Sequence, residues 1–99
     1  MEIVKKKEDG VLSVAVEGRL DTTTSPELEA ALAEEYPAKL VFDFSKLEYI
    51  SSAGLRVLLA AQKKMNAGGG EMIIRGTQEA VKDVFEVTGF LDFLHLEEE

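Results

Sequence analysis

Two adjacent serines, Ser51 and Ser52, stand where an apolar run gives way to a helix-like run. The apolar run, 40–44, is typical of a buried strand, and 55–65 has the spacing of a helix. At a helix N-terminus the first backbone N–H groups are unpaired and the dipole is positive, so a phosphate is well accommodated. A serine at this junction can therefore be a helix cap, a nucleophile or a phosphorylation site.

A serine that acts as a nucleophile needs a histidine base and an orienting acid, as in a serine hydrolase. The single histidine, His95, lies close to the acidic end of the sequence, and no Gly-x-Ser-x-Gly motif is present. The chain has no cysteine, which removes the thiolate as a nucleophile or metal ligand. We therefore expect that the chain is not an enzyme.

Three acids, Asp21, Asp43 and Glu48, are the candidates for metal binding or acid–base chemistry. Their spacing matches no metal-binding loop, so we expect hydrogen bonds to loop and turn backbone N–H groups instead. The glycines at 68–70 follow a helix and precede no Gly-Lys-Ser/Thr, which predicts a helix stop rather than a phosphate loop. No metal and no cofactor are expected.

The bulk composition predicts a single globular domain over residues 1–99, with 45% hydrophobic and 30% charged residues. The net charge of −8 argues against nucleic acid as a partner, because 5–7 is the only basic cluster. The N-terminus does not resemble a signal peptide, and the longest apolar run, 57–61, is too short to span a bilayer. We expect a cytoplasmic protein without membrane insertion.

The elements that position the serines follow an α/β pattern. Strand-like runs at 3–7 and 11–17 flank an Asp-Gly turn and predict an N-terminal hairpin, followed by a polar loop at 18–24. Helices are expected from a cap at Ser25 to a stop at Pro37, from Ser51 or Ser52 to 67, and from 77 or 78 to Gly89. Further strands are expected at 39–44 and 71–76, and 90–96 should form a helical turn or a last small strand.

Strands separated by helices predict a mixed, mostly parallel sheet of four to five strands, with the hairpin at one end and helices packed on it. In such a sheet, both Asp21 and Asp43 should lie near the serine junction.

The segment 41–55 resembles the signature of STAS domains, specifically the anti-sigma-factor antagonists. In that family a strand ends in aspartate, and a serine stands before a small residue, glycine and leucine at a helix start. The segment 18–21, Gly-Arg-Leu-Asp, is similar to the family motif after its second strand, and 84–90 is similar to its late helix and cap. The three motifs stand in the family order and cover nearly the whole chain.

The resemblance implies a bacterial regulator of transcription that works by partner switching. Ser52 takes the place of the serine that is phosphorylated by the partner anti-sigma factor, itself a serine kinase. The unphosphorylated antagonist binds this kinase and frees a sigma factor, phosphorylation breaks the complex, and a phosphatase restores it. The implied partner-binding face consists of Asp21, Thr22, Ser45, Ser51, Ser52, Ala53, Gly54 and Arg56.

Two positions depart from the family pattern, which often has aspartate at Ser51 and glycine at Arg56. Ser51 is therefore a competing phosphoacceptor. Arg56 is either a solvated arginine or a contact to an acidic partner group or to the phosphate.

Two other function classes fit parts of the sequence. One is a STAS accessory subunit on the cytoplasmic ATPase of a transporter, which need not be phosphorylated. The other is a domain that contacts a nucleotide near Ser52, which calorimetry with ATP or GTP would test.

Overall fold

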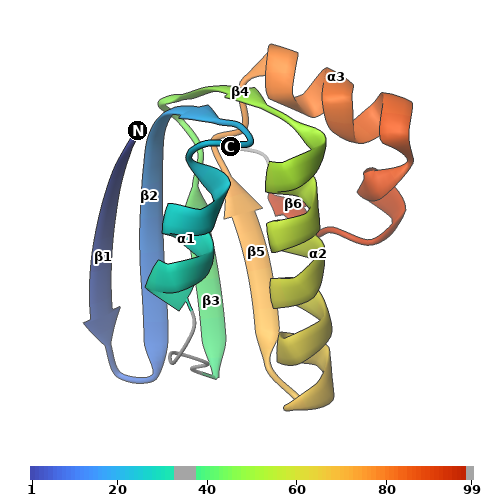
Figure 1. Ribbon diagram of the computed structural model, residues 1–99. Coiled ribbons are helices and arrows are strands. Elements are labelled where there is room, and N and C mark those ends of the chain that lie inside the picture. Colours follow the sequence, from blue (N-terminus) through green and yellow to red (C-terminus); the bar gives the residue numbers. More distant parts are fainter. Residues whose placement is uncertain (33–37, 98–99) are drawn as a thin grey trace.

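The computed structural model describes residues 1–32 and 38–97 (Figure 1). The strands are β1 (Glu2–Glu8), β2 (Val11–Leu20), β3 (Lys39–Asp43), β4 (Leu47–Ile50), β5 (Glu71–Arg75) and β6 (Leu96–Glu97). The helices are α1 (Ser25–Leu32), α2 (Ser52–Ala67), α3 (Glu79–Thr88) and the 3-10 turn η1 (Phe90–Asp92). The predicted stop of the first helix at Pro37 lies outside the described residues.

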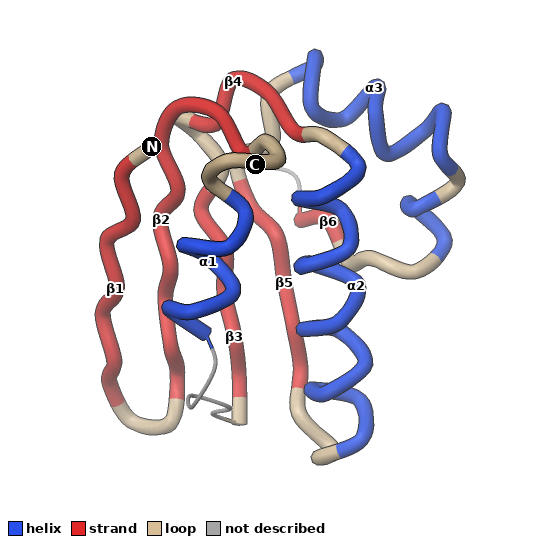
Figure 2. The backbone as a smooth tube through the Cα atoms, viewed as in Figure 1, coloured by secondary structure: helices blue, strands red, loops and turns tan. Residues whose placement is uncertain are grey.

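The strands form one sheet in the order β1-β2-β3-β5-β6, and β4 pairs with β2 off this path (Figure 2). β1 and β2 form an antiparallel hairpin, and the other pairings are parallel. β2 pairs with β3 as far as Ala15 opposite Asp43, and then with β4 from Gly18 opposite Leu47. The predicted mixed, mostly parallel sheet with an N-terminal hairpin is confirmed.

The main core lies between the sheet and the helices α1 and α2, which stand side by side in front of it in Figure 1. β2 contributes every second residue, Leu12, Val14 and Val16, because alternate side chains of a strand point to one face. α2 buries an apolar stripe at helical spacing, made of Leu55, Leu58, Ala61 and Met65. This packing fixes the position of the first turn of α2 relative to the end of β2.

Two expectations from the sequence were wrong at the end of the sheet where β4 lies. The predicted polar loop at 18–24 starts three residues too early, because β2 continues to Leu20. The described residues also form six strands rather than four to five, since the linker after β3 contains β4. β4 has only four residues and buries just its two ends, Leu47 and Ile50, so it lacks the alternation that marks a strand.

The helix ends that lie within the described residues agree with the predicted caps and stops, apart from Ser25. Gly89 ends α3 in the left-handed conformation, as expected for a C-terminal glycine. Ser25, predicted as a cap, is instead the buried first residue of α1, and its hydroxyl donates to the Asp21 carbonyl. The 90–96 segment forms both predicted alternatives, the turn η1 and part of β6. No helix within the described ranges is long and apolar enough to cross a membrane.

Candidate functional site

The two serines of the junction differ in accessibility. Ser51 is the N-cap of α2, and its N–H donates to the Leu20 carbonyl at 2.9 Å. Its hydroxyl oxygen is buried and has no hydrogen-bond partner, and it makes no capping bond. Ser52 is the first residue of α2 and is exposed. The α2 N-terminus therefore presents the Ser52 hydroxyl, and not that of Ser51, to the surroundings.

The loop that contains Asp21 lies beside this helix start, because Ser51 bonds to the residue that precedes Asp21. The carboxylate oxygen Oδ1 of Asp21 accepts the N–H groups of Thr23 and Thr24, each at 3.0 Å, and lies 3.1 Å from the Thr24 hydroxyl. The N–H of Thr24, followed by its hydroxyl and the N–H of Thr23, lowers the pKa of Asp21, with a smaller contribution from Arg19. Asp21 thus holds the turn that leads into α1, as expected for an aspartate that bonds to nearby backbone.

A second surface feature, not expected from the sequence, is a stacked pair of Arg19 and Tyr49. The guanidinium carbon of Arg19 lies 4.2 Å from the centre of the Tyr49 ring, and the guanidinium Nε is 4.0 Å from Asp21 Oδ2. The β2–β4 register shifts between Gly18 and Arg19, where Gly18 has a φ of 96°. Such a bulge turns the following side chain, which accounts for the alignment of Arg19 with Tyr49.

Gly54 has a structural role that differs from the predicted one. It is buried, and a Cβ at this position would lie 2.8 Å from Ile50 Cγ1 and 2.8 Å from Leu20 Cγ. Gly54 therefore lets α2 approach the ends of β2 and β4 closely. Its expected contact with a partner stays a prediction.

The other predicted face residues near the helix start are accessible to different degrees. Thr22 is exposed in the loop after β2, and Ala53 is half-buried. Arg56 is exposed and lies one turn after Ser52, so both side chains belong to the same face of α2. The structure thus brings together Asp21, Thr22, Ser52 and Arg56 around one helix N-terminus.

Ser45 lies apart from this group. It is in the turn between β3 and β4, and β4 alone separates it from the serine junction by about 10 Å. Its N–H donates to Asp43 Oδ1 at 2.9 Å, and its carbonyl accepts from Gln78 Nε2 at 2.8 Å. The strand β4, which was not predicted from the sequence, therefore stands between the Ser45 loop and the serine junction along the chain. The role of Ser45 in partner binding stays a prediction.

Two of the three acids singled out in the sequence, Asp21 and Asp43, act in turns, whereas Glu48 is an exposed residue of strand β4. Asp43 accepts from Ser45, and both the hydroxyl and the N–H of Ser45 lower the pKa of Asp43, as Lys46 does to a lesser degree. In the described part of the chain, no three histidines or acids lie close enough together to hold a metal ion.

Acidification should weaken the fold through these two turns. The folded-state pKa values of Asp21 and Asp43 lie below the ordinary value of 3.8. Their charged forms therefore stabilise the fold fully above that value, and this stabilisation is lost as the pH falls through the folded-state pKa values. Urea denaturation should show a free energy of unfolding that declines below about pH 4.

The Asp43→Asn variant isolates one of these contributions. Its free energy of unfolding at neutral pH should be lower than that of the wild type by less than about 1 kcal/mol, because Asp43 is exposed and solvent screens its charge. That free energy should also decline less on acidification. Asp83→Asn, which removes an exposed carboxylate of α3, is the matched control. An Asp43→Asn curve parallel to the wild type across the acid range would contradict this role.

The comparisons with known proteins agree with this architecture. The STAS domain family model matches residues 2–99. BtrV of Bordetella bronchiseptica, described as a candidate anti-sigma factor antagonist, is 36% identical, over 92% of this chain and 81% of its own. The crystal structure of an anti-sigma factor antagonist from Mycobacterium paratuberculosis superposes with a TM-score of 0.82 at 30% identity, covering 96% of this chain and 83% of the other.

A more distant likeness concerns the fold alone. SpoIIAA of Bacillus, an anti-sigma factor antagonist, has been solved in unphosphorylated and phosphorylated forms. These superpose with TM-scores of 0.83 and 0.79 at 16% and 14% identity, covering 99% of this chain and 88% and 91% of theirs. With a family model that matches almost every residue and a relative of 36% identity, the chain belongs to the STAS domain family.

Proposed function

We propose that this chain is an anti-sigma factor antagonist that is switched by phosphorylation of Ser52. In the unphosphorylated form it binds an anti-sigma factor that is a serine kinase, and a phosphatase reverses the modification. The binding face consists of Asp21, Thr22, Ser52 and Arg56, with the Arg19–Tyr49 pair at its edge. Tyr49 is 38% exposed and stacks on Arg19, which suits a contact residue because tyrosine and arginine are enriched where binding energy concentrates.

The observation that carries the proposal is the contrast between the two serines. The Ser52 side chain is exposed, whereas the hydroxyl oxygen of Ser51 is buried. The Ser52 hydroxyl is therefore more accessible to a kinase that approaches the folded domain than the Ser51 hydroxyl is. This contrast favours Ser52 over Ser51 as the phosphoacceptor.

The surroundings of Ser52 suit a phosphate. The first N–H groups of α2 have no acceptor within the helix, and Ser51 provides no capping bond to them. A phosphoserine adds about −1.5 to −2 charges at the positive end of the helix dipole. Arg56 on the same face adds a cation. The phosphorylated domain should therefore remain folded, and the modification should act at the interface with the kinase.

The relatives support the same function. BtrV and the Mycobacterium paratuberculosis protein carry descriptions as anti-sigma factor antagonists, and SpoIIAA has been solved with and without its phosphate. Both SpoIIAA forms superpose on this chain with TM-scores near 0.8, which fits a switch that leaves the fold in place.

The test begins with a pull-down from the source cells, in which the unmodified chain should recover a serine kinase of the anti-sigma type. That kinase is then incubated with ATP and the wild type, Ser51→Ala or Ser52→Ala, followed by mass spectrometry. Phosphate should appear on the wild type and Ser51→Ala and be absent from Ser52→Ala.

Two results would contradict the proposal. If Ser51 of the Ser52→Ala variant were phosphorylated at the wild-type rate, Ser51 and not Ser52 would be the phosphoacceptor. Recovery of a transporter ATPase, with no modification of either serine, would favour the accessory-subunit function.

A further inference from the structure

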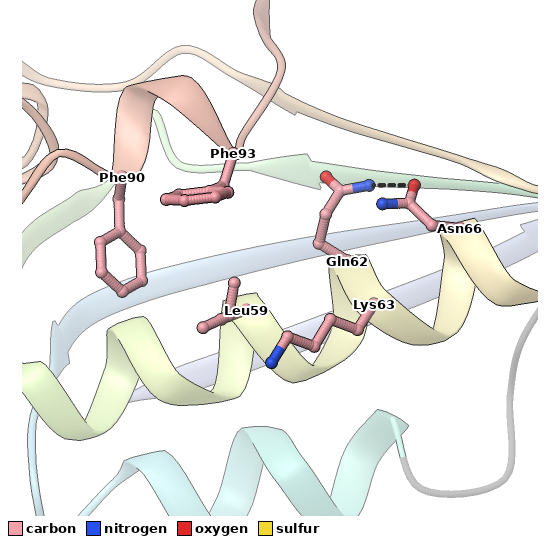
Figure 3. A pocket seen from close by; sticks show the side chains of 6 residues that line it. All are labelled: Leu59, Gln62, Lys63, Asn66, Phe90 and Phe93. Atoms are coloured by element: carbon pink, nitrogen blue, oxygen red, sulfur yellow. Dashed lines mark hydrogen bonds between the residues drawn. The ribbon is translucent and has the colours of Figure 1, made fainter.

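A small cavity separates the second half of α2 from the segment around η1 (Figure 3). Its volume is about 250 Å³, and it is lined by Leu59, Gln62, Lys63 and Asn66 of α2 and by Phe90 and Phe93. Gln62 lies about three helical turns from Ser52 along α2. The cavity is therefore separate from the switch face.

The walls of this cavity are mainly apolar. Figure 3 shows the rings of Phe90 and Phe93 opposite Leu59 of α2. The two rings meet edge to face, with centres 6.4 Å apart and planes at 75°. Phe93 is 63% exposed, so much of its ring is in contact with water. An apolar group placed in the cavity would cover this ring and gain hydrophobic stabilisation.

The polar groups at the cavity favour an anion. Lys63 extends along the lower side of α2 in Figure 3 and takes part in none of the ion pairs found among the described residues. Gln62 Nε2 donates to Asn66 Oδ1 at 3.0 Å, which leaves the side-chain NH₂ of Asn66 as a donor. A lysine ammonium beside an apolar pocket complements a molecule with an apolar body and a negative head group.

We propose that this cavity binds a small amphipathic carboxylate. Its apolar chain or ring, of about eight carbons given a cavity at the lower end of ligand-site sizes, lies among Leu59, Phe90 and Phe93. Its carboxylate pairs with Lys63. This site does not depend on the phosphorylation of Ser52.

The test is an NMR titration of isotope-labelled protein with octanoate and, in parallel, with 1-octanol. Octanoate should shift the resonances of Leu59, Phe90 and Phe93 and should bind about fivefold more tightly than octanol, the contribution of one exposed ion pair. The Lys63→Gln variant should lose this preference and keep the octanol affinity. Lys64→Gln, the same change at the adjacent exposed position, should behave as the wild type.

A second variant tests the apolar wall. Phe93→Ser removes a ring that is already largely exposed, so the domain should remain folded, and both ligands should bind at least about tenfold more weakly. Three results would overturn the proposal: no shifts at the lining residues, equal affinity for octanoate and octanol, or the same shifts on raising the protein concentration without ligand. The last would assign the cavity to contact with a second copy of the chain.

Discussion

Replacement of Ser52 by aspartate should weaken binding to the partner kinase about a hundredfold or more while the domain stays folded. The kinase surface should fit a small hydroxyl at this position, so the carboxylate would lose its water in the complex and gain no partner from the kinase. The α2 N–H groups and Arg56 already lie beside it in the free domain and offset only part of this loss. A buried charge left without a partner costs about 3–5 kcal/mol. In the free domain, the same charge lies at the start of α2, where it stabilises the helix by about 0.3–1 kcal/mol.

Calorimetry of the complex and thermal unfolding of the free domain together check this result. Ser52→Asn is the matched control, because it has the size of aspartate without its charge and should bind with intermediate affinity. Ser52→Ala should bind as the wild type. If Ser52→Asp bound undiminished, or if it unfolded, the interface mechanism would be wrong.

The second large effect is expected at Gly54. Alanine there would place its Cβ 2.8 Å from side-chain atoms of both Leu20 and Ile50, and 3.0 Å from a second atom of Leu20. Both neighbours are fully buried, so they cannot move aside freely. The Gly54→Ala variant should lose about 1–3 kcal/mol of stability, which lowers Tm by about 4–8 °C for each kcal/mol.

The same substitution should impair partner binding, because the start of α2 must shift away from the loop of Asp21. Gly68→Ala is the control: Gly68 ends the same helix with a φ of −87°, and a Cβ there meets its nearest neighbour at 3.5 Å. The free energy of unfolding of this control should lie within about 1 kcal/mol of the wild-type value. A Gly54→Ala domain as stable as the Gly68→Ala domain would show that the close approach is unimportant.

The sequence predicted those parts of the fold that depend on local patterns. The hairpin follows from an Asp-Gly turn between two β-rich runs, and α2 begins where small polar residues precede an apolar stripe. The left-handed Gly89 follows from a glycine after the last periodic residue of α3. In each case the signal lies within a few neighbouring residues.

The parts that escaped prediction depend on contacts between distant residues. β4 forms because it pairs with the end of β2. Four residues without alternating buried and exposed side chains do not predict such a pairing. The stacking of Arg19 on Tyr49 depends on the register of that pairing and on the bulge at Gly18. The burial of Gly54 depends on how closely α2 crosses Leu20 and Ile50. None of these distances is encoded in spacing along the chain.

A hydroxyl held in the first turn of a helix is not presented to an enzyme as a flexible peptide. The residues around Ser52 in space include the loop of Asp21, which is remote in sequence and reaches the helix through the bond from Ser51 to Leu20. An enzyme that modifies Ser52 on the native domain must therefore read a three-dimensional epitope rather than a linear consensus. The specificity of such an enzyme for its substrate depends on the whole folded surface around Ser52. Residues far from Ser52 in the sequence can therefore decide which of several related domains the enzyme modifies.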